Sequence, residues 1–446
     1  MDYQQSLHLL QELTKFGINQ GLSRVEELLR RLGDPHRAGI KFAHIAGTNG
    51  KGSVSAMLAS ILREAGLKTG FFSSPHLHSY RERYRIDGRL ISEEKVASLV
   101  SEISVHINEM VAEGFESPTE FEAGTALALL YFARRRVDWA VIETGMGGSI
   151  DSTNAIDARL AVITNVALDH RKYLGDTVAE IATVKAGIIK ADCAAITGAE
   201  AEALRIIEER ACRMNTRLQV LPRDFCYYPR SYSLAAGHVG QTFDIRTQKA
   251  EYKELFLPLL GQYQLSNAAL AVAAAETAGL DEAAIRGGLA KTDWPGRLEI
   301  ISQQPLIVMD GAHNSHGMEA LSASLQEYWP QKKIVAVMGM LADKDRRAAL
   351  EKILPQLDQL IITRPPNRRA GDWQYLAELA AEKGVPVCTK EDITAACDQA
   401  LARLDEESLL LVCGSLYLLA DARKWMLQKY GASKAGGVEH DYENRF

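Results

Sequence analysis

A lysine, a serine and three glycines lie close together in the segment GTNGKGS, Gly47–Ser53. Converging backbone N–H groups and the start of a helix attract an anion, Lys51 adds a positive charge, and Ser53 offers a hydroxyl to Mg²⁺. A standard P-loop places its lysine six residues after the first glycine, whereas here the separation is four. The segment therefore predicts a shortened phosphate-binding loop. A plain glycine turn is the alternative.

Further polar side chains stand where predicted strands end. Glu143 ends the apolar run DWAVIE, His170 comes shortly after RLAVIT, and Ser74 follows KTGFF. A carboxylate at such a place is costly unless it meets a cation, and Mg²⁺ takes carboxylates together with substrate phosphates. Lys185 lies on a predicted helix among apolar residues. Taken singly, these residues also read as a surface acid, a packed histidine, a turn serine and a lysine that reaches solvent. Taken together, they predict a magnesium–nucleotide site.

The elements around these residues predict the architecture. KFAHIA before the loop and VSAMLASILREAG after it read as a strand and a helix, and further strands and helices alternate along the first half. This pattern is typical of a mostly parallel sheet, whose ligands bind at the carboxyl ends of its strands. We predict an α/β protein: an N-terminal P-loop-like doubly wound domain with a small antiparallel sheet, and a smaller C-terminal Rossmann-like domain. The expected ranges are 1–294 with the appended sheet at about 225–260, 298–430, and a disordered tail at 431–446.

Two details complete the organisation. DWPGRLE, Asp293–Glu299, predicts a hinge because Trp-Pro-Gly interrupts a helix. Four apolar runs after it, PLIVMD, KIVAVM, QLIIT and LLLVC, predict the strands of the second domain.

Composition narrows the class of protein. The chain has 446 residues, which suits two domains, and its formal net charge of −6 lacks the basic excess of a nucleic-acid binder. No apolar run is long enough for a membrane span, and the N-terminus does not resemble a secretory signal. We expect a cytoplasmic protein without a membrane or nucleic-acid partner. The six scattered cysteines, which form no C-x-x-C pair, are expected to be reduced core residues.

A series of longer motifs carries a family resemblance. GLSRVEELLRRLG, HIAGTNGKGS, SSPHL, TEFEAGTALAL, ETGMGGSIDSTN, LDHRKYLGDTVAEIATVKAGIIK, GQYQLSNAALA, WPGRLE, DGAHN, ADKD and CGSLYL occur in this order. The chain thus resembles the folylpolyglutamate synthase/dihydrofolate synthase family, a branch of the Mur-type ATP-dependent amide ligases. The resemblance extends from about residue 15 to about residue 420, and this family carries the shortened loop.

The resemblance implies roles for individual residues. The catalytic residues would be Lys51, Glu143, His170 and Lys185. ATP would be held by Thr48, Asn49, Gly50, Lys51, Gly52, Ser53, Asn267, Arg297, Asp310 and His313. Two Mg²⁺ ions would be bound by Ser53, Ser74, Glu143, His170 and a carbamylated Lys185. The pterin side of the substrate would meet Ile18, Asn19, Gln20, Thr119, Glu120, Phe121, Glu122, Ile150, Asp151 and Ser152. A requirement for a monovalent cation stays open.

The activity implied is the ATP-dependent ligation of L-glutamate to the terminal carboxylate of folate through an acyl phosphate. A second activity, making dihydrofolate from dihydropteroate, is also expected, as is a monomer. The chain departs from the family pattern at Ser149, Tyr263 and the pair Arg171–Lys172, where Arg, His and Thr-Glu are common. Two alternatives stay open: a Mur-type ligase for a non-folate carboxylate, and a P-loop protein that hydrolyses nucleotide as a switch.

Overall fold

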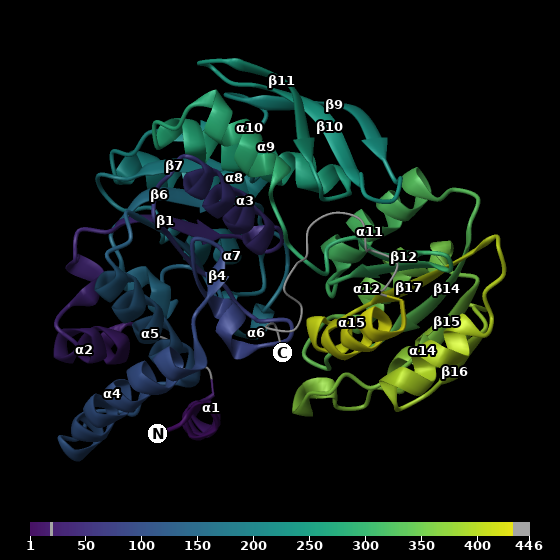
Figure 1. Ribbon diagram of the computed structural model, residues 1–446, viewed down its shortest axis with the longest axis horizontal. Helices are drawn as coiled ribbons and strands as arrows, with labels where there is room; N and C mark the ends of the chain where they lie inside the picture. The colour runs from purple at the N-terminus through teal and green to yellow at the C-terminus, as the bar shows by residue number, and fades with distance from the viewer. Residues whose placement is uncertain (18–20, 431–446) are drawn as a thin grey trace.

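A computed structural model describes residues 1–17 and 21–430 (Figure 1). The candidate substrate residues Ile18–Gln20 and the expected tail, 431–446, lie outside the described residues. None of the helices within the described ranges is both long and apolar enough to cross a lipid bilayer.

The first sheet has eight strands, and those at its centre are parallel. Its order is β4 (Arg89–Leu90), β3 (Tyr84–Ile86), β2 (Thr69–Phe72), β5 (Trp139–Glu143), β1 (Lys41–Ala46), β6 (Ala158–Ile163), β7 (Ala194–Thr197) and β8 (Leu218–Val220). The sequence predicts β1, β2, β5, β6 and β7 but misses the other three. Those three are only two or three residues long, which is too short to show an apolar pattern.

Helices cover both faces of this sheet, as expected for a doubly wound fold. Along β1, Phe42 packs against one face and Ala43 and Ile45 against the other, because successive side chains of a strand point in opposite directions. One face carries α1 (Tyr3–Leu13), α2 (Ser23–Arg31), α4 (Glu93–Ala112), α5 (Glu120–Arg135), α7 (Val178–Ala186) and α8 (Ala201–Arg213). The other face carries α3 (Lys51–Glu64), α9 (Gln262–Thr277) and α10 (Glu282–Ala290).

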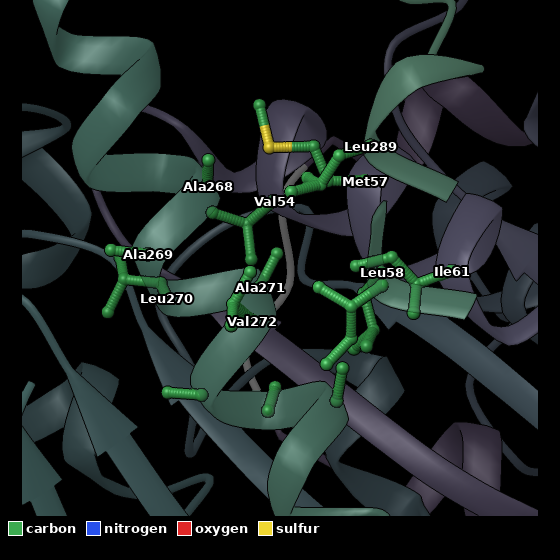
Figure 2. Close-up of a cluster of buried hydrophobic side chains, with 14 of the residues drawn as sticks. Val54, Met57, Leu58, Ile61, Ala268, Ala269, Leu270, Ala271, Val272 and Leu289 are labelled. Atoms are coloured by element: carbon green, nitrogen blue, oxygen red, sulfur yellow. The ribbon is translucent and has the colours of Figure 1, made fainter. Parts of the chain in front are cut away.

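The helix after the glycine loop is fixed by close packing. Figure 2 shows Val54, Met57, Leu58 and Ile61 of α3 together with Ala268–Val272 of α9, three of which are alanines, and with Leu289 of α10. All of these side chains are buried, and the alanines of α9 let the two helices approach closely. The start of α3 is therefore held in place near the carboxyl end of β1.

The antiparallel sheet predicted near residues 225–260 is present. It has the order β11 (Glu251–Leu257), β10 (Gly240–Arg246) and β9 (Cys226–Ser233), and it lies beside α9 along the top of Figure 1. Phe243, Ile245, Leu255 and Leu257 join the same core as α3 and α9. This sheet is thus packed onto the first domain.

The second sheet lies at the right of Figure 1 and has six strands. Its order is β12 (Glu299–Gln303), β13 (Leu306–Asp310), β17 (Ser408–Cys413), β14 (Lys333–Met338), β15 (Gln359–Ile362) and β16 (Val387–Thr389). One face packs on α11 (Ser315–Tyr328), α12 (Arg346–Ile353) and α13 (Tyr375–Glu382), the other on α14 (Ile393–Leu401) and α15 (Leu416–Tyr430).

The four predicted strands of this sheet are β13, β14, β15 and β17, and they are parallel. The sequence misses the two edge strands. β12 pairs antiparallel with β13, and β16 has only three residues.

The cysteines are partly mispredicted. All six are free, in agreement with a reduced protein, but only Cys193, Cys397 and Cys413 are buried. Cys212 is exposed at the end of α8, and Cys226 and Cys388 are half-buried on edge strands. The prediction of six core thiols is wrong for these three, because their positions face the outside of their elements.

Candidate active site

The carboxyl ends of both sheets line two adjoining cavities. The loop cavity, of about 790 Å³, is lined by Gly47–Ser53, and the Asp151 cavity, of about 330 Å³, by Ile150–Ser152. Ser74, His170 and His313 line both. Such volumes suit small-molecule ligands. The loop cavity brings together every residue predicted to bind ATP or metal: Thr48, Asn49, Gly50, Lys51, Gly52, Ser53, Ser74, Glu143, His170, Lys185, Asn267, Arg297, Asp310 and His313.

The loop after β1 has the geometry of an anion site. Gly50 caps α3 with φ of 83°, and a side chain there would also collide with the amide of Asn267. The first N–H groups of α3 have no partner within the helix and face the loop cavity, where the helix dipole favours negative charge. A plain glycine turn, the alternative, would not explain why the glycines and the start of the helix border the same cavity.

Two lysines converge on one carbonyl oxygen of this loop. Lys51 Nζ donates to Gly47 O at 3.1 Å and to Thr48 O at 3.3 Å, while Lys185 Nζ donates to Gly47 O at 2.8 Å. Burial, and then the charge of Lys51, lower the pKa of Lys185 to about 7. The alternative reading of Lys185 as a lysine that reaches solvent does not hold, since its side chain is buried and points at the loop.

Glu143 ends β5 inside the loop cavity with little compensation for its charge. Its Oε2 accepts one hydrogen bond, from Ser74 N at 3.3 Å, and the residue is 5% exposed. Burial raises the pKa of Glu143 to about 7, and the nearby Lys51 opposes this only in part. A buried carboxylate with so few partners is suited to a cation that arrives from outside.

Asp169 has very different surroundings, because the second domain supplies its partners. Lys344 Nζ donates to Asp169 Oδ1 at 2.7 Å, and Asn314 Nδ2 donates to Asp169 Oδ2 at 3.0 Å. Burial works to raise the pKa of Asp169, but the Lys344 ammonium and His170 bring it well below its usual range. Asn314 also exchanges hydrogen bonds with Asn49 of the loop. The phosphate-type loop and the second domain are thus directly joined.

The two predicted histidines lie beside Lys344. Burial, followed by the Lys344 charge, lowers the pKa of His170 and of His313 to about 4, so both rings are neutral near pH 7. His313 Nδ1 donates to Gly311 O at 2.8 Å, which leaves Nε2 as an acceptor. Neutral rings are the form in which histidine binds a metal or accepts a proton.

The hinge side of the loop cavity is held by Asp310. Its carboxylate accepts from Leu298 N at 2.8 Å, from Ala312 N at 2.7 Å and from Tyr263 OH at 3.3 Å. Arg297 Nη1 donates to Gly296 O at 2.9 Å. Asp310 therefore fixes the turn between the two domains as well as lining the cavity.

Of the residues predicted to meet the pterin, Thr119, Phe121, Glu122 and Ile150–Ser152 line the Asp151 cavity. Thr119 caps α5, and Glu122 completes the capping box by accepting from Thr119 N at 2.7 Å. Glu122 also forms a buried ion pair with Arg24 at 3.0 Å. Its carboxylate is thus already engaged by the protein.

The rest of the predicted substrate set consists of Glu120 and Ile18–Gln20. Glu120 does not line the cavity: its Oε1 accepts from Tyr80 OH and from Arg83 Nη1, both at 2.8 Å. Ile18–Gln20 lie outside the described residues, and the neighbouring Gly17 and Gly21 line the cavity.

The sequence analysis missed several polar residues of the Asp151 cavity. They come from segments without a recognisable motif or from the carboxyl ends of the second sheet: Arg83, Lys344, Arg369, Ser415 and Tyr417. Three of them are cationic, which suits a ligand with carboxylate groups. Two of the motifs could have signalled some of them, because ADKD contains Lys344 and CGSLYL contains Ser415 and Tyr417.

The oxygen-bearing side chains beside the loop decide whether a divalent metal can bind there. Within residues 1–17 and 21–430, no three His, Cys, Asp or Glu side chains gather closely enough to hold an ion. Glu143, Ser53 and Ser74 nevertheless offer one buried carboxylate and two hydroxyls beside the loop. Mg²⁺ commonly takes one or two carboxylates and completes its shell with phosphates and water. These residues fit such a shared site.

The departures from the family pattern have defined places. Tyr263 lines the loop cavity and bonds Asp310, whereas Ser149 N donates to Val184 O at 2.8 Å on the loop before Asp151. Arg171 forms an exposed ion pair with Asp176 at 3.0 Å. Only Tyr263 contacts the machinery of the loop cavity directly.

Known proteins resemble this chain along most of its length. The Mur ligase middle domain matches residues 45–275, and the glutamate ligase domain of Mur ligases matches residues 296–416. The dihydrofolate synthase/folylpolyglutamate synthase of Bacillus subtilis is 35% identical over 433 residues, covering 95% of this chain and 98% of that protein. A structure of the Mycobacterium tuberculosis folylpolyglutamate synthase complexed with ADP has a TM-score of 0.89 at 33% identity, covering 95% of this chain and 99% of that one.

An archaeal relative is longer. The probable bifunctional folylpolyglutamate synthase/dihydropteroate synthase of Haloferax volcanii is 38% identical over 426 residues, covering 95% of this chain but 50% of that protein. The chain spans about half the length of that relative. The two Mur ligase domains together nevertheless match most of this chain, and the two bacterial relatives each cover 95% of it. The chain therefore belongs to the folylpolyglutamate synthase/dihydrofolate synthase family of the Mur ligases.

Proposed function

We propose that this protein is an ATP-dependent ligase that joins L-glutamate to the terminal carboxylate of folate, and also to dihydropteroate to make dihydrofolate. The observation that carries the proposal is the junction of the two cavities at Ser74, His170 and His313. One cavity has a phosphate-type loop and the other an apolar wall with cationic groups. A carboxylate at the junction can reach a terminal phosphate. The names of the bacterial relatives support folate as the substrate.

The reaction follows from this arrangement. The folate carboxylate attacks the γ-phosphorus of ATP, and ADP leaves as the acyl phosphate forms. The amino group of glutamate then attacks the acyl carbon, and inorganic phosphate leaves with the electron pair of the broken C–O bond. Lys51 and the N–H groups of α3 stabilise negative charge on the phosphates. The remaining contribution is the positioning of the reactants, which requires no nucleophilic serine or cysteine.

Glu143, Ser53 and Ser74 would hold one Mg²⁺, and His170 with a carbamylated Lys185 would hold a second beside Glu143. Bound Mg²⁺ neutralises charge on the transferring phosphoryl group. The carbamate is supported by the lowered pKa of Lys185, since only a neutral amine reacts with CO₂. It also resolves an electrostatic conflict, because an ammonium beside Mg²⁺ is repelled whereas a carbamate is an anion.

We further propose that the carboxylates of the incoming glutamate meet the cationic groups from the second domain. Lys344 and Arg369 line the Asp151 cavity together with Ser415, and they face the predicted pterin residues across it. Closure of the second domain would therefore bring glutamate and exclude water from the acyl phosphate. The hinge at Asp293–Glu299 lies between the two sheets, in agreement with such a motion.

ADP release tests the proposal. The purified protein with Mg-ATP and L-glutamate is assayed with tetrahydrofolate, with dihydropteroate and without a pterin. Release with both pterins is expected. Release with tetrahydrofolate alone would limit the activity to polyglutamylation. Release that neither pterin stimulates would reject the folate assignment and direct attention to a different carboxylate, whereas release without any dependence on an amino acid would indicate a switch ATPase.

A further inference from the structure

A histidine lies buried at the centre of the first sheet, within hydrogen-bonding distance of the short segment that follows Asp151. His44 is the fourth residue of β1, is 0% exposed, and pairs with the strands on both sides, β5 and β6. Its Nε2 lies 2.8 Å from Oγ1 of Thr153. Thr153 belongs to the short 3-10 helix η4 (Ser152–Ala155), which directly follows Asp151.

The hydrogen bonds around Asp151 assign the direction of this contact. Thr153 Oγ1 lies 2.5 Å from Asp151 Oδ1, Thr153 N donates to the same oxygen at 3.0 Å, and Met146 N donates to Oδ2 at 2.7 Å. Burial raises the pKa of Asp151, but the surrounding donors oppose this and favour the carboxylate. The single hydroxyl hydrogen of Thr153 is used for Asp151, so Thr153 accepts from His44 Nε2–H. The chain of donation runs from His44 through Thr153 to Asp151.

The other ring nitrogen of His44 shows that this arrangement lowers the stability of the fold. Among the described residues, Nδ1 of His44 has no hydrogen-bond partner although it is buried. An apolar side chain would fill this place in the sheet without an unpaired polar atom. The imidazole is therefore not explained by packing. Its bond to Thr153 is the contact that an apolar residue would lose.

Other residues hold the backbone of the same segment but do not reach the carboxylate. Lys190 Nζ donates to Asn154 O and to Ile156 O, both at 2.7 Å, and Thr125 Oγ1 lies 2.7 Å from Ser152 Oγ. These contacts fix where η4 lies. The side chains that reach the carboxylate of Asp151 are that of Thr153, directly, and that of His44, through Thr153.

We propose that His44 is a positioning residue for the pterin-bearing substrate, acting through Thr153 on Asp151. Asp151 lines the cavity, and a pterin ring carries an amino group and a ring N–H that suit a carboxylate. His44 touches no substrate, yet it sets the direction of the group that does. The inference rests on the proposed function.

Four single variants and one double variant test it by steady-state kinetics. His44→Leu and Thr153→Val remove the donor and the relay, and each is expected to raise KM for the pterin substrate about tenfold, with kcat and KM for ATP changing less than about twofold. The double variant should resemble either single one, because both break the same chain. His44→Gln and Thr153→Ser retain a donor and a hydroxyl and should restore most of the affinity.

Thr363→Val is the matched control. Thr363 is also a fully buried threonine, but it follows β15 in the second domain, its hydroxyl donates to Glu391 O at 3.1 Å, and it lines neither cavity. It should reproduce any general loss of stability in thermal unfolding without changing KM. A folded His44→Leu protein with unchanged KM for the pterin overturns the inference, as does an equal rise in every KM or a failure of His44→Gln to restore affinity.

A second measurement separates this inference from the proposed function. Long-range ¹H–¹⁵N spectra of the histidine-labelled protein, with His44→Leu to assign the signal, should show His44 neutral and protonated at Nε2. Another tautomer overturns the relay whatever the kinetics show. If the tautomer is as expected but no pterin stimulates the wild type, the proposed function fails and the substrate role of the relay fails with it.

Discussion

Glu143, which is buried, and Asp169, which is partly buried, are carboxylates near the carboxyl ends of β5 and β6, with β1 between these strands, yet their surroundings are opposite. Glu143 accepts one long hydrogen bond and has a pKa raised to about 7 by burial. Asp169 is paired with Lys344 and Asn314, and its pKa lies well below the usual range. Both lie where a parallel sheet places its ligand-binding residues.

The difference shows that position at a strand end does not define a role. The fold leaves Glu143 incompletely paired, at a cost in stability, which suits a residue that awaits a cation. The fold uses Asp169 to join the loop domain to the second domain through Lys344. Changes at the two carboxylates should therefore have different consequences. Replacing Glu143 should remove catalysis, whereas replacing Asp169 should weaken the contact between the two domains.

The largest effect is expected for Glu143→Gln. Loss of the carboxylate that would bind Mg²⁺ should lower kcat for ADP release about 10³-fold. Glu276→Gln is the matched control, because Glu276 is a buried glutamate of α9 that is bonded by Thr247 and Tyr252 and lines neither cavity. Equal kcat values for the two variants would contradict a special role for Glu143.

The same substitution should raise stability in the absence of metal. The folded pKa of Glu143, about 7, lies above the ordinary 4.5, so the folded protein loses stability as pH rises from 4.5 to 7. At pH 8 with a chelator, Glu143→Gln should unfold with a free energy about 3 kcal/mol greater than that of the wild type. Below pH 4.5 the difference should vanish. Urea unfolding at both pH values measures it, and a less stable variant at pH 8 would show that Glu143 is well paired after all.

Lys185→Ala should come next, with a fall in kcat of about 10² and ATP affinity changed less than about threefold. The reason is that a carbamate on Lys185 would act on the metal and not on the nucleotide. ADP release and nucleotide titration of the same preparation measure the two effects. Turnover near that of the wild type would remove the carbamate from the mechanism.

The smallest effect is expected for Asp169→Asn, a fall in kcat of about tenfold with little change in KM for ATP. The amide keeps the shape but loses the charge that holds Lys344, so the closed arrangement of the domains is weakened. Asp176→Asn, which alters an exposed pair with Arg171 on the same segment, should be almost silent. A fall as large as that of Glu143→Gln would place Asp169 in the chemistry itself.

The sequence predicts the loop side of the site well because its residues are local. Gly47–Ser53 form one contiguous motif, and Glu143 and His170 follow apolar runs that read as parallel strands. The rule that such strands share a ligand edge then brings them together. The fold class follows from the same alternation, whereas short edge strands such as β8 and β16 escape it.

On the Asp151 side, motifs give part of the lining, such as Thr119 and Ile150–Ser152, but not the contacts between distant segments. Arg83 and Lys344 reach the cavity only because two sheets pack with their carboxyl ends facing each other. The carboxylate of Glu120 turns to Arg83 and that of Glu122 to Arg24, across long distances in sequence. His44 is hidden within an apolar run, and only its neighbour Thr153 in space indicates a purpose.

Isotope transfer tests the central claim, the acyl phosphate, most directly. Tetrahydrofolate labelled with ¹⁸O in its terminal carboxylate is incubated with the protein, Mg-ATP and L-glutamate, and the inorganic phosphate is analysed by mass spectrometry. Attack of the carboxylate on ATP predicts that each phosphate released carries one ¹⁸O and that the new amide keeps the other. Unlabelled phosphate, formed while ADP is released, would show that water attacked ATP and would contradict the ligase mechanism.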